Sequence, residues 1–114
     1  MIIPSFDTIK TMKPIVDLHM HTTFSDGLKT PEELIDFAKS RGVEVMCIND
    51  HDTVKGVMHM LTMKLSDITV LCGIELSSTF EEDYSTIHVT GYFPRDTKFE
   101  TLQEELSEVV TKKR

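Results

Sequence analysis

The segment VEVMCIN, residues 43–49, constrains the fold of this chain more than any other stretch. It is apolar at nearly every position, whereas a strand with one solvent-exposed face would alternate apolar and polar residues. Such a strand is buried on both faces, which is typical of parallel sheets covered by helices. We therefore expect an α/β fold built on a mostly parallel sheet.

The rest of the chain supplies further strands and the helices that would cover them. We expect this order of elements: strand 14–21, helix 31–41, strand 43–49, helix 54–64, strand 68–76, strand 85–93 and helix 98–112. The order β-α-β-α-β-β-α places helices between parallel strands. The short acidic join between the last two strands favours an antiparallel hairpin. In such sheets, active sites gather at the carboxyl ends of the strands.

The sequence also predicts where the helices begin and which residues form the core. Thr30 and Glu33 form a capping box around Pro31, and Gly42 ends that helix. We expect Asp52 or Thr53 to cap the second helix. The apolar residues of the second and third helices are interpreted as core, although a methionine-rich binding surface is an alternative for the second: Met58, Met60, Leu61, Met63, Phe99, Leu102, Leu106, Val109 and Val110.

Length and composition exclude several classes of protein. The 114 residues fit one domain, and the net charge of -7 disfavours a broad nucleic-acid surface. A small phosphorylated substrate remains compatible if bound cations invert the local field. The N-terminal segment lacks the apolar core of a signal peptide, and no run is long enough to span a membrane, so we expect a cytoplasmic protein. Cys47 and Cys72 lie in apolar runs and are expected to be buried, reduced thiols.

The first strand ends in DLHMH, which brings two imidazoles together. Residues two apart in a strand share a face, so Asp17, His19 and His21 should point the same way. The two histidines can then chelate one cation, with Asp17 orienting one of them. Asp26 follows in a flexible turn and can reach the same pocket.

The other strand ends carry residues of the same kinds. The polar run Asn49 to Asp52 contains His51, Glu75 lies inside an apolar strand, and His88 lies on the polar face of the fourth strand. A buried carboxylate is costly unless it is paired or bound to metal. Mixed imidazole and carboxylate ligands suit Zn²⁺, Mn²⁺ or Fe²⁺, and their number suggests more than one cation. His59, within the second helix, is interpreted as structural or solvated.

These motifs resemble those of the polymerase and histidinol phosphatase (PHP) superfamily. The resemblance covers DLHMHTTFSDG (17–27), INDHDTVKG (48–56), GIELSS (73–78) and HVTGYF (88–93). It implies a distorted (β/α)7 barrel, of which this chain would form the N-terminal half, so residues 1–114 would be a truncated or half-length PHP domain. It also implies hydrolysis of a phosphate ester by metal-activated water at a multinuclear site.

The resemblance assigns roles to individual residues. It implies two or three divalent ions (Zn, Mn, Fe or Mg), with Glu75 as a bridging ligand and Asp17 and Asp52 as catalytic residues that orient the ligands. The implied metal ligands are His19, His21, Asp26, His51, Glu75 and His88. Ser77, Ser78 and Thr53 are expected to be hydrogen-bonding neighbours and not nucleophiles.

The chain departs from the family pattern after its fourth strand. It has no histidine after His88, whereas the family supplies further ligands from later strands. A closed eightfold barrel takes ~250 residues, so the chain is expected to form about half of one. An open sheet exposes a strand edge and apolar surface, which favours a homodimer or larger assembly.

Two alternatives to a phosphoesterase remain open. The first is a non-catalytic metal-binding or assembly module derived from a PHP domain, which the short length favours. The intact early motifs weigh against it, because an abandoned site has no reason to keep costly buried polar groups. The second, an amidohydrolase-like enzyme acting on C–N bonds, is less favoured because its later lysine and histidine ligands are not recognisable.

Overall fold

The computed structural model describes residues 15–79 and 86–113 of the chain. Its strands are β1 (Ile15–Met20), β2 (Val43–Ile48), β3 (Thr69–Thr79) and β4 (Thr86–Phe93). Its helices are α2 (Pro31–Ser40), α3 (Lys55–Met60) and α4 (Phe99–Lys113). This is the predicted order of elements. Residue 14 and the join between the last two strands, residues 80–85, lie outside the described residues.

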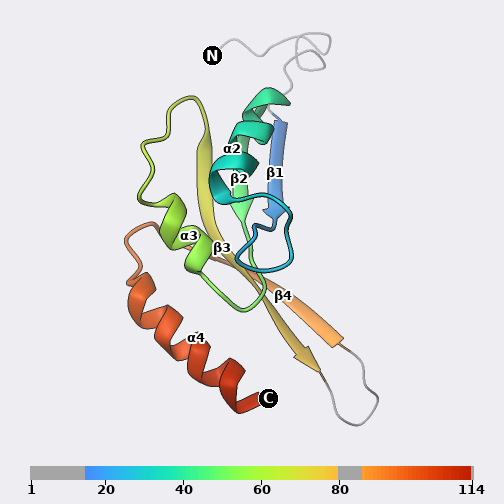
Figure 1. The fold of residues 1–114 in the computed structure, drawn as a ribbon, viewed down its shortest axis with the longest axis vertical. Helices are drawn as coiled ribbons and strands as arrows, with labels where there is room; N and C mark the ends of the chain where they lie inside the picture. Colours follow the sequence, from blue (N-terminus) through green and yellow to red (C-terminus); the bar gives the residue numbers. More distant parts are fainter. Residues whose placement is uncertain (1–14, 80–85, 114) are drawn as a thin grey trace, which may run out of the picture.

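The four strands form one curled sheet in the order β1-β2-β3-β4 (Figure 1). The first three strands are parallel, and β4 returns antiparallel to β3 with Glu75 opposite Thr90. The expected hairpin is therefore confirmed. Helices α2 and α3 lie over one face of the sheet, and α4 runs alongside the β3–β4 hairpin. Within residues 15–79 and 86–113, no helix lies over the other face, which carries the polar side chains of the candidate site.

The core lies between the sheet and its helices. Side chains from β2 and β3 meet α2, α3 and the first turn of α4, and these buried residues include Ile35, Met46, Ile48, Val57, Met60, Val70, Ile74 and Phe99. Leu102 and Leu106 pack partly against this core, whereas Val109 is half exposed. Cys47 and Cys72 are free and buried as predicted, and burial raises the pKa of the Cys47 thiol to about 12.

Helix α2 begins as its sequence predicts. The Thr30 hydroxyl accepts a hydrogen bond from the Glu33 amide at 3.2 Å, and the Glu33 carboxylate accepts one from the Thr30 amide at 3.1 Å. The second bond lowers the pKa of Glu33. Gly42 follows the C-cap residue Arg41 and takes a positive φ of 78°, a conformation that glycine adopts without steric cost.

Helix α3 differs from its prediction in both length and cap. It covers Lys55–Met60 and not 54–64, and its N-cap is Val54, which has no side-chain capping bond. Asp52 takes a φ of 55° and accepts a hydrogen bond from the Ser77 amide instead. The Gln103 side chain of α4 accepts bonds from the Val54 amide at 2.7 Å and from the Thr53 hydroxyl at 3.0 Å. A distant residue thus takes the place of the expected local cap.

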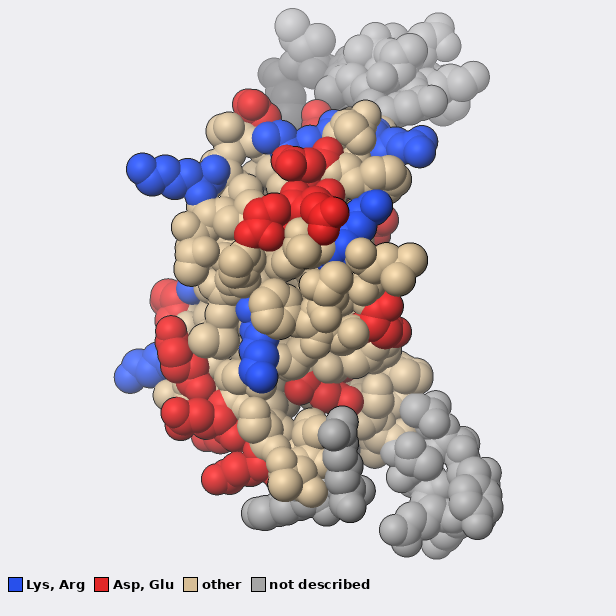
Figure 2. Space-filling view, viewed as in Figure 1, with Lys and Arg blue, Asp and Glu red and all other residues tan. Residues whose placement is uncertain are grey.

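Charge is spread unevenly over the described surface. Figure 2 shows acidic side chains gathered along α4, whose exposed glutamates are Glu100, Glu104, Glu105 and Glu108. No helix in the described ranges is both long enough and apolar enough to cross a membrane.

Candidate metal centre

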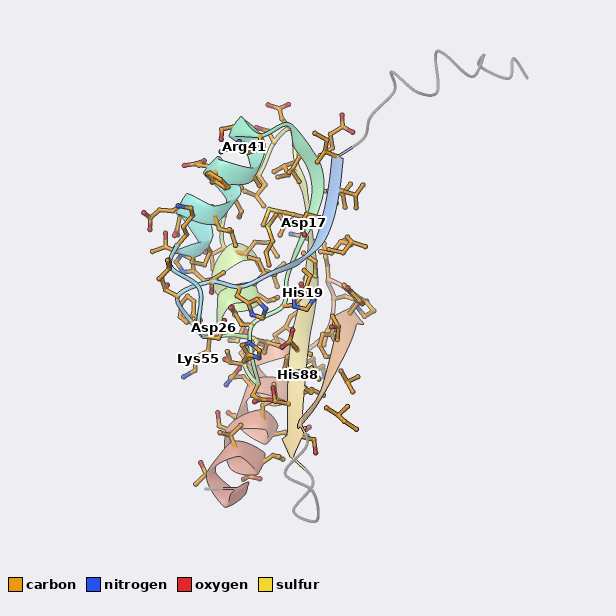
Figure 3. All side chains as sticks on the ribbon, turned by 90° about the vertical axis from the view of Figure 1, so that its right-hand side faces the viewer. Asp17, His19, Asp26, Arg41, Lys55 and His88 are labelled. Atoms are coloured by element: carbon orange, nitrogen blue, oxygen red, sulfur yellow. The ribbon has the colours of Figure 1, made fainter. Side chains whose placement is uncertain are left out.

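Six side chains predicted as metal ligands meet on the face of the sheet opposite α2 and α3. They come from the end of β1, the loop after it, the segment after β2, the middle of β3 and from β4 (Figure 3). We call this set the donor cluster: His19, His21, Asp26, His51, Glu75 and His88. His51 reaches the cluster because its backbone forms a bridge with Glu75, which extends the β2–β3 pairing past the end of β2.

Glu75 lies at the centre of the donor cluster and is only 6% exposed. Its Oε1 atom lies 2.5 Å from His19 Nε2 and 3.6 Å from His21 Nε2. Its Oε2 atom lies 2.9 Å from His51 Nδ1 and 3.0 Å from His88 Nδ1. Each carboxylate oxygen therefore faces a different pair of imidazoles.

The donor atoms fall into three groups of metal-site dimensions. In each group the ligand atoms lie within 4.8 Å of one another, and the groups are His19–His21–Glu75, His21–Asp26–His51 and His51–Glu75–His88. Neighbouring groups share a residue. Asp26 joins the second group through contacts of 3.4 Å to His21 Nδ1 and 3.1 Å to His51 Nε2.

The packing of the imidazoles fits bound cations better than a hydrogen-bond network. His21 Nδ1 is buried and makes no hydrogen bond within the described residues. The Nε2 atoms of His19 and His21 face each other at 3.1 Å, and the rings of His21 and His51 stack with centroids 4.5 Å apart. A buried nitrogen is normally paired, so His21 Nδ1 needs a partner beyond its 3.4 Å contact with Asp26. Imidazole and carboxylate donors together suit a divalent transition-metal ion.

Asp50 fixes the loop that carries His21 and Asp26. It is 1% exposed and accepts hydrogen bonds from the Thr22 amide (2.6 Å), the Thr22 hydroxyl (2.7 Å) and the Ser25 hydroxyl (2.7 Å). The sequence placed Asp50 in a polar run but gave it no role. One sequence feature could have indicated this role: Asp50 is a carboxylate directly after a buried strand. A buried carboxylate requires several hydrogen-bond donors.

Tight backbone packing supports the same loop. A Cβ at Gly27 would overlap the His21 carbonyl, and a Cβ at Gly56 would overlap the Asp50 carboxylate. Glycine is therefore required at both positions, because the neighbouring atoms leave no room for a Cβ. Gly27, the glycine of the SDG motif, thus packs against His21, where the loop begins.

Asp17 lies at an irregularity in the pairing of β1. The register of β1 against β2 shifts between Asp17 and Met20, where three steps along β1 match the two from Met46 to Ile48. The Asp17 carboxylate accepts a hydrogen bond from the His19 amide at 3.2 Å, and among the described contacts it meets no imidazole. The register of β1 is thus irregular next to Asp17, whose role in orienting a histidine stays a prediction.

Asp52 also binds backbone and not a ligand ring. Its carboxylate accepts from the Ser77 amide at 3.0 Å, and its own amide donates to the Glu75 carbonyl at 3.0 Å. These bonds hold the β3 backbone on either side of Leu76. The Ser77 hydroxyl lies 3.1 Å from His88 Nδ1, as expected of a hydrogen-bonding neighbour.

His59 lies outside the donor cluster. Its Nε2 atom contacts the Glu32 carboxylate, which joins α3 to α2, and this hydrogen bond lowers the pKa of Glu32. This contact agrees with the prediction that His59 is structural or solvated.

The sequence profile of the PHP domain family matches residues 17–112. The chain belongs to the PHP domain family. The match includes all six residues of the donor cluster and continues into α4. The expected PHP-type α/β architecture is thereby confirmed.

Two relatives of this PHP chain are named after reactions of phosphate esters. A 5'-3' exoribonuclease of Haemophilus influenzae is 38% identical over 76 residues, which are 66% of this chain and 27% of that protein. A phosphoribosyl 1,2-cyclic phosphate 1,2-diphosphodiesterase of Eggerthella lenta is 36% identical over 78 residues, which are 68% of this chain and 30% of that protein. The chain thus spans under a third of the length of these relatives.

Two solved structures share the fold. An amidohydrolase of Chromobacterium violaceum with bound sulfate and no metal is 29% identical, with a TM-score of 0.63 over 79% of this chain and 32% of that one. A candidate metal-dependent phosphoesterase of Bifidobacterium adolescentis is 28% identical, with a TM-score of 0.63 over 82% of this chain and 32% of that one. A metal-dependent phosphoesterase family implies divalent metal ions.

Proposed function

We propose that this PHP domain forms part of a metal-dependent phosphoesterase site, in which the donor cluster would hold divalent ions and a phosphate ester is hydrolysed by water. The observation that carries the proposal is the position of Glu75, whose two oxygens each face a different pair of imidazoles. A buried carboxylate surrounded in this way is best explained as a ligand shared between cation sites.

The names of the relatives support the same reaction class. One is a cyclic phosphate diphosphodiesterase, and a 3',5'-nucleoside bisphosphate phosphatase of Chromobacterium violaceum is 34% identical over 77 residues. Each name describes cleavage of a phosphate ester. The proposed substrate is accordingly a small phosphorylated molecule.

The three groups of donor atoms are the proposed binding sites for two or three ions of Zn, Mn, Fe or Mg. Such ions lower the pKa of bound water and offset the charge that develops on a phosphoryl group. The residues of the chain hold the ligands in place. Asp50 fixes the loop of His21 and Asp26, and Asp52 fixes the backbone next to Glu75.

Metal content is the first test of the proposed ligands. We expect the purified chain to bind about two transition-metal ions and His21→Ala to lose at least one, because His21 belongs to two of the three donor groups. Elemental analysis after dialysis measures both values. His59→Ala is the matched control, since His59 lies outside the donor cluster. Equal metal content in the wild type and His21→Ala would contradict the assignment.

Activity is a separate test of the reaction class. With added Mn²⁺, we expect weak hydrolysis of an aryl phosphate by the wild type and at least a ~100-fold loss in Glu75→Gln, because the charge shared between the sites is removed. Phosphate release measures the rate. Metal binding without any hydrolysis would favour the alternative of a non-catalytic metal-binding module.

A further inference from the structure

A side chain from one edge of the sheet reaches the opposite edge next to the donor cluster. The Tyr92 hydroxyl of β4 donates a hydrogen bond to the Leu18 carbonyl of β1 at 3.1 Å. β1 and β4 are the two outer strands of the sheet. Neighbouring strands lie ~4.8 Å apart, so a flat sheet would separate these edges by ~14 Å, which is further than a tyrosine side chain reaches. The bond therefore depends on the curl of the sheet (Figure 1).

The strands between these edges leave a path for the Tyr92 ring. Phe93 packs against the helix-covered core, so Tyr92, one residue earlier, points to the opposite face with the donor cluster. Gly73 of β3 is its register partner and presents no side chain there. Cys47 and Asn49 are 0% exposed and crowd Gly73, although no helix among the described residues lies over this face. A side chain that crosses from β4 to β1 helps to explain their burial.

The bond from Tyr92 ends where β1 departs from regular pairing. The register of β1 against β2 includes neither Leu18 nor His19. On the far side of this gap, Asn49 Oδ1 accepts from the Met20 amide at 3.3 Å, and the Asn49 amide donates to the Met20 carbonyl at 2.7 Å. Backbone groups outside a regular ladder need other partners, and the Tyr92 hydroxyl supplies one for the Leu18 carbonyl. The backbone of His19 is therefore anchored on both sides.

We propose that Tyr92 is a positioning residue for His19 and acts on it through the Leu18 backbone. The consequence for metal binding rests on the proposed function, in which His19 is a ligand. The His19 side chain is 50% exposed, so packing alone does not fix its ring, yet its Nε2 atom lies 2.5 Å from Glu75 Oε1. An anchored backbone supplies the missing constraint. Loss of the Tyr92 hydroxyl should therefore weaken the donor group His19–His21–Glu75 in particular.

Imidazole NMR of the metal-free chain tests the positioning directly. Ring nitrogen signals of the ¹⁵N-labelled full chain are recorded with chelator at a fixed pH. Tyr92→Phe keeps the ring and removes only the hydroxyl, and we expect it to shift the ring signals of His19 and not those of His59. Thr62→Val is the matched control, because the Thr62 hydroxyl donates to the His59 carbonyl outside the donor cluster. Unchanged His19 signals in Tyr92→Phe would overturn the inference.

Titration with Co²⁺ tests the consequence for metal binding, and its visible spectrum reports the geometry of the ligands. We expect Tyr92→Phe to raise the Kd of one bound ion about tenfold and to alter its spectrum. In a His19→Ala background the same change should have no further effect, whereas in a His51→Ala background the tenfold effect should persist. Equal effects in both backgrounds would indicate a general loss of stability and would overturn a role through His19.

The inference and the proposed function fail in different ways. Co²⁺ binding that is unaffected by His19→Ala and His21→Ala would overturn the proposed ligands, whereas a shift of the His19 ring signals in Tyr92→Phe would still support the positioning role. Weaker Co²⁺ binding in His19→Ala but not in Tyr92→Phe would overturn the role of Tyr92 and leave the ligands intact.

Discussion

Asp50 accepts three hydrogen bonds from the loop that carries two donor-cluster residues, and Gly56 packs against its carboxylate. A buried carboxylate of this kind is stable only while all its donors stay in place. The position of His21 therefore depends on a residue that is not itself in the donor cluster. Small changes next to Asp50 should therefore shift His21 within the donor cluster.

Gly56→Ala is a sharp test of this packing. In an ordinary helix the change would stabilise the fold by up to ~1 kcal/mol. Here the added methyl would overlap the Asp50 carboxylate, so we expect a loss of about 1–3 kcal/mol in the free energy of unfolding. Urea denaturation measures this value.

Gly91→Ala is the matched control for Gly56→Ala. An added Cβ at Gly91 would meet Ile74 at an ordinary 3.5 Å, so stability should stay within about 1 kcal/mol of the wild type. A stabilised Gly56→Ala protein would show that Asp50 tolerates displacement.

Much of the candidate site could be predicted from residue types and their positions at strand ends. His19, His21, Glu75 and His88 lie together as the strand register requires. The register shift next to Asp17 could not be predicted, because it depends on the pairing of β1 with β2 and not on local sequence. The roles of the predicted residues as metal ligands stay a proposal until the metal is measured.

At the scale of elements, the two helix starts show what local sequence does and does not determine. The capping box of α2 is complete within four residues, so the sequence predicts it correctly. The α3 start depends on Gln103, which lies 49 residues from Val54. No local pattern contains that partner, so the predicted cap was wrong.

Gln103→Ala should loosen the junction between α3 and α4. It removes the acceptor for the Val54 amide and the Thr53 hydroxyl, so we expect a loss of about 1–2 kcal/mol in stability. Hydrogen exchange at the Val54 amide should accelerate more than exchange in β2. Glu104→Ala, at an exposed neighbouring position, is the control. Unchanged protection of Val54 would mean that water replaces Gln103 at no cost.

At the scale of the whole molecule, assembly stays a prediction. β1 is at the edge of the sheet, and Ile15, Val16 and Leu18 on it are all at least 40% exposed. Such an edge favours pairing with a second copy. We expect a homodimer or larger assembly in light scattering, and Leu18→Lys should shift it toward monomer. A wild-type monomer at high concentration would contradict the prediction.

The two carboxylate oxygens of Glu75 face different pairs of imidazoles, and this arrangement links the proposed metal sites to one another. The carboxylate is a single rigid group, so a substitution that displaces it alters both pairs of imidazoles at once. A change at Glu75 should consequently weaken two neighbouring cation sites together, whereas the loss of one histidine should weaken mainly its own group.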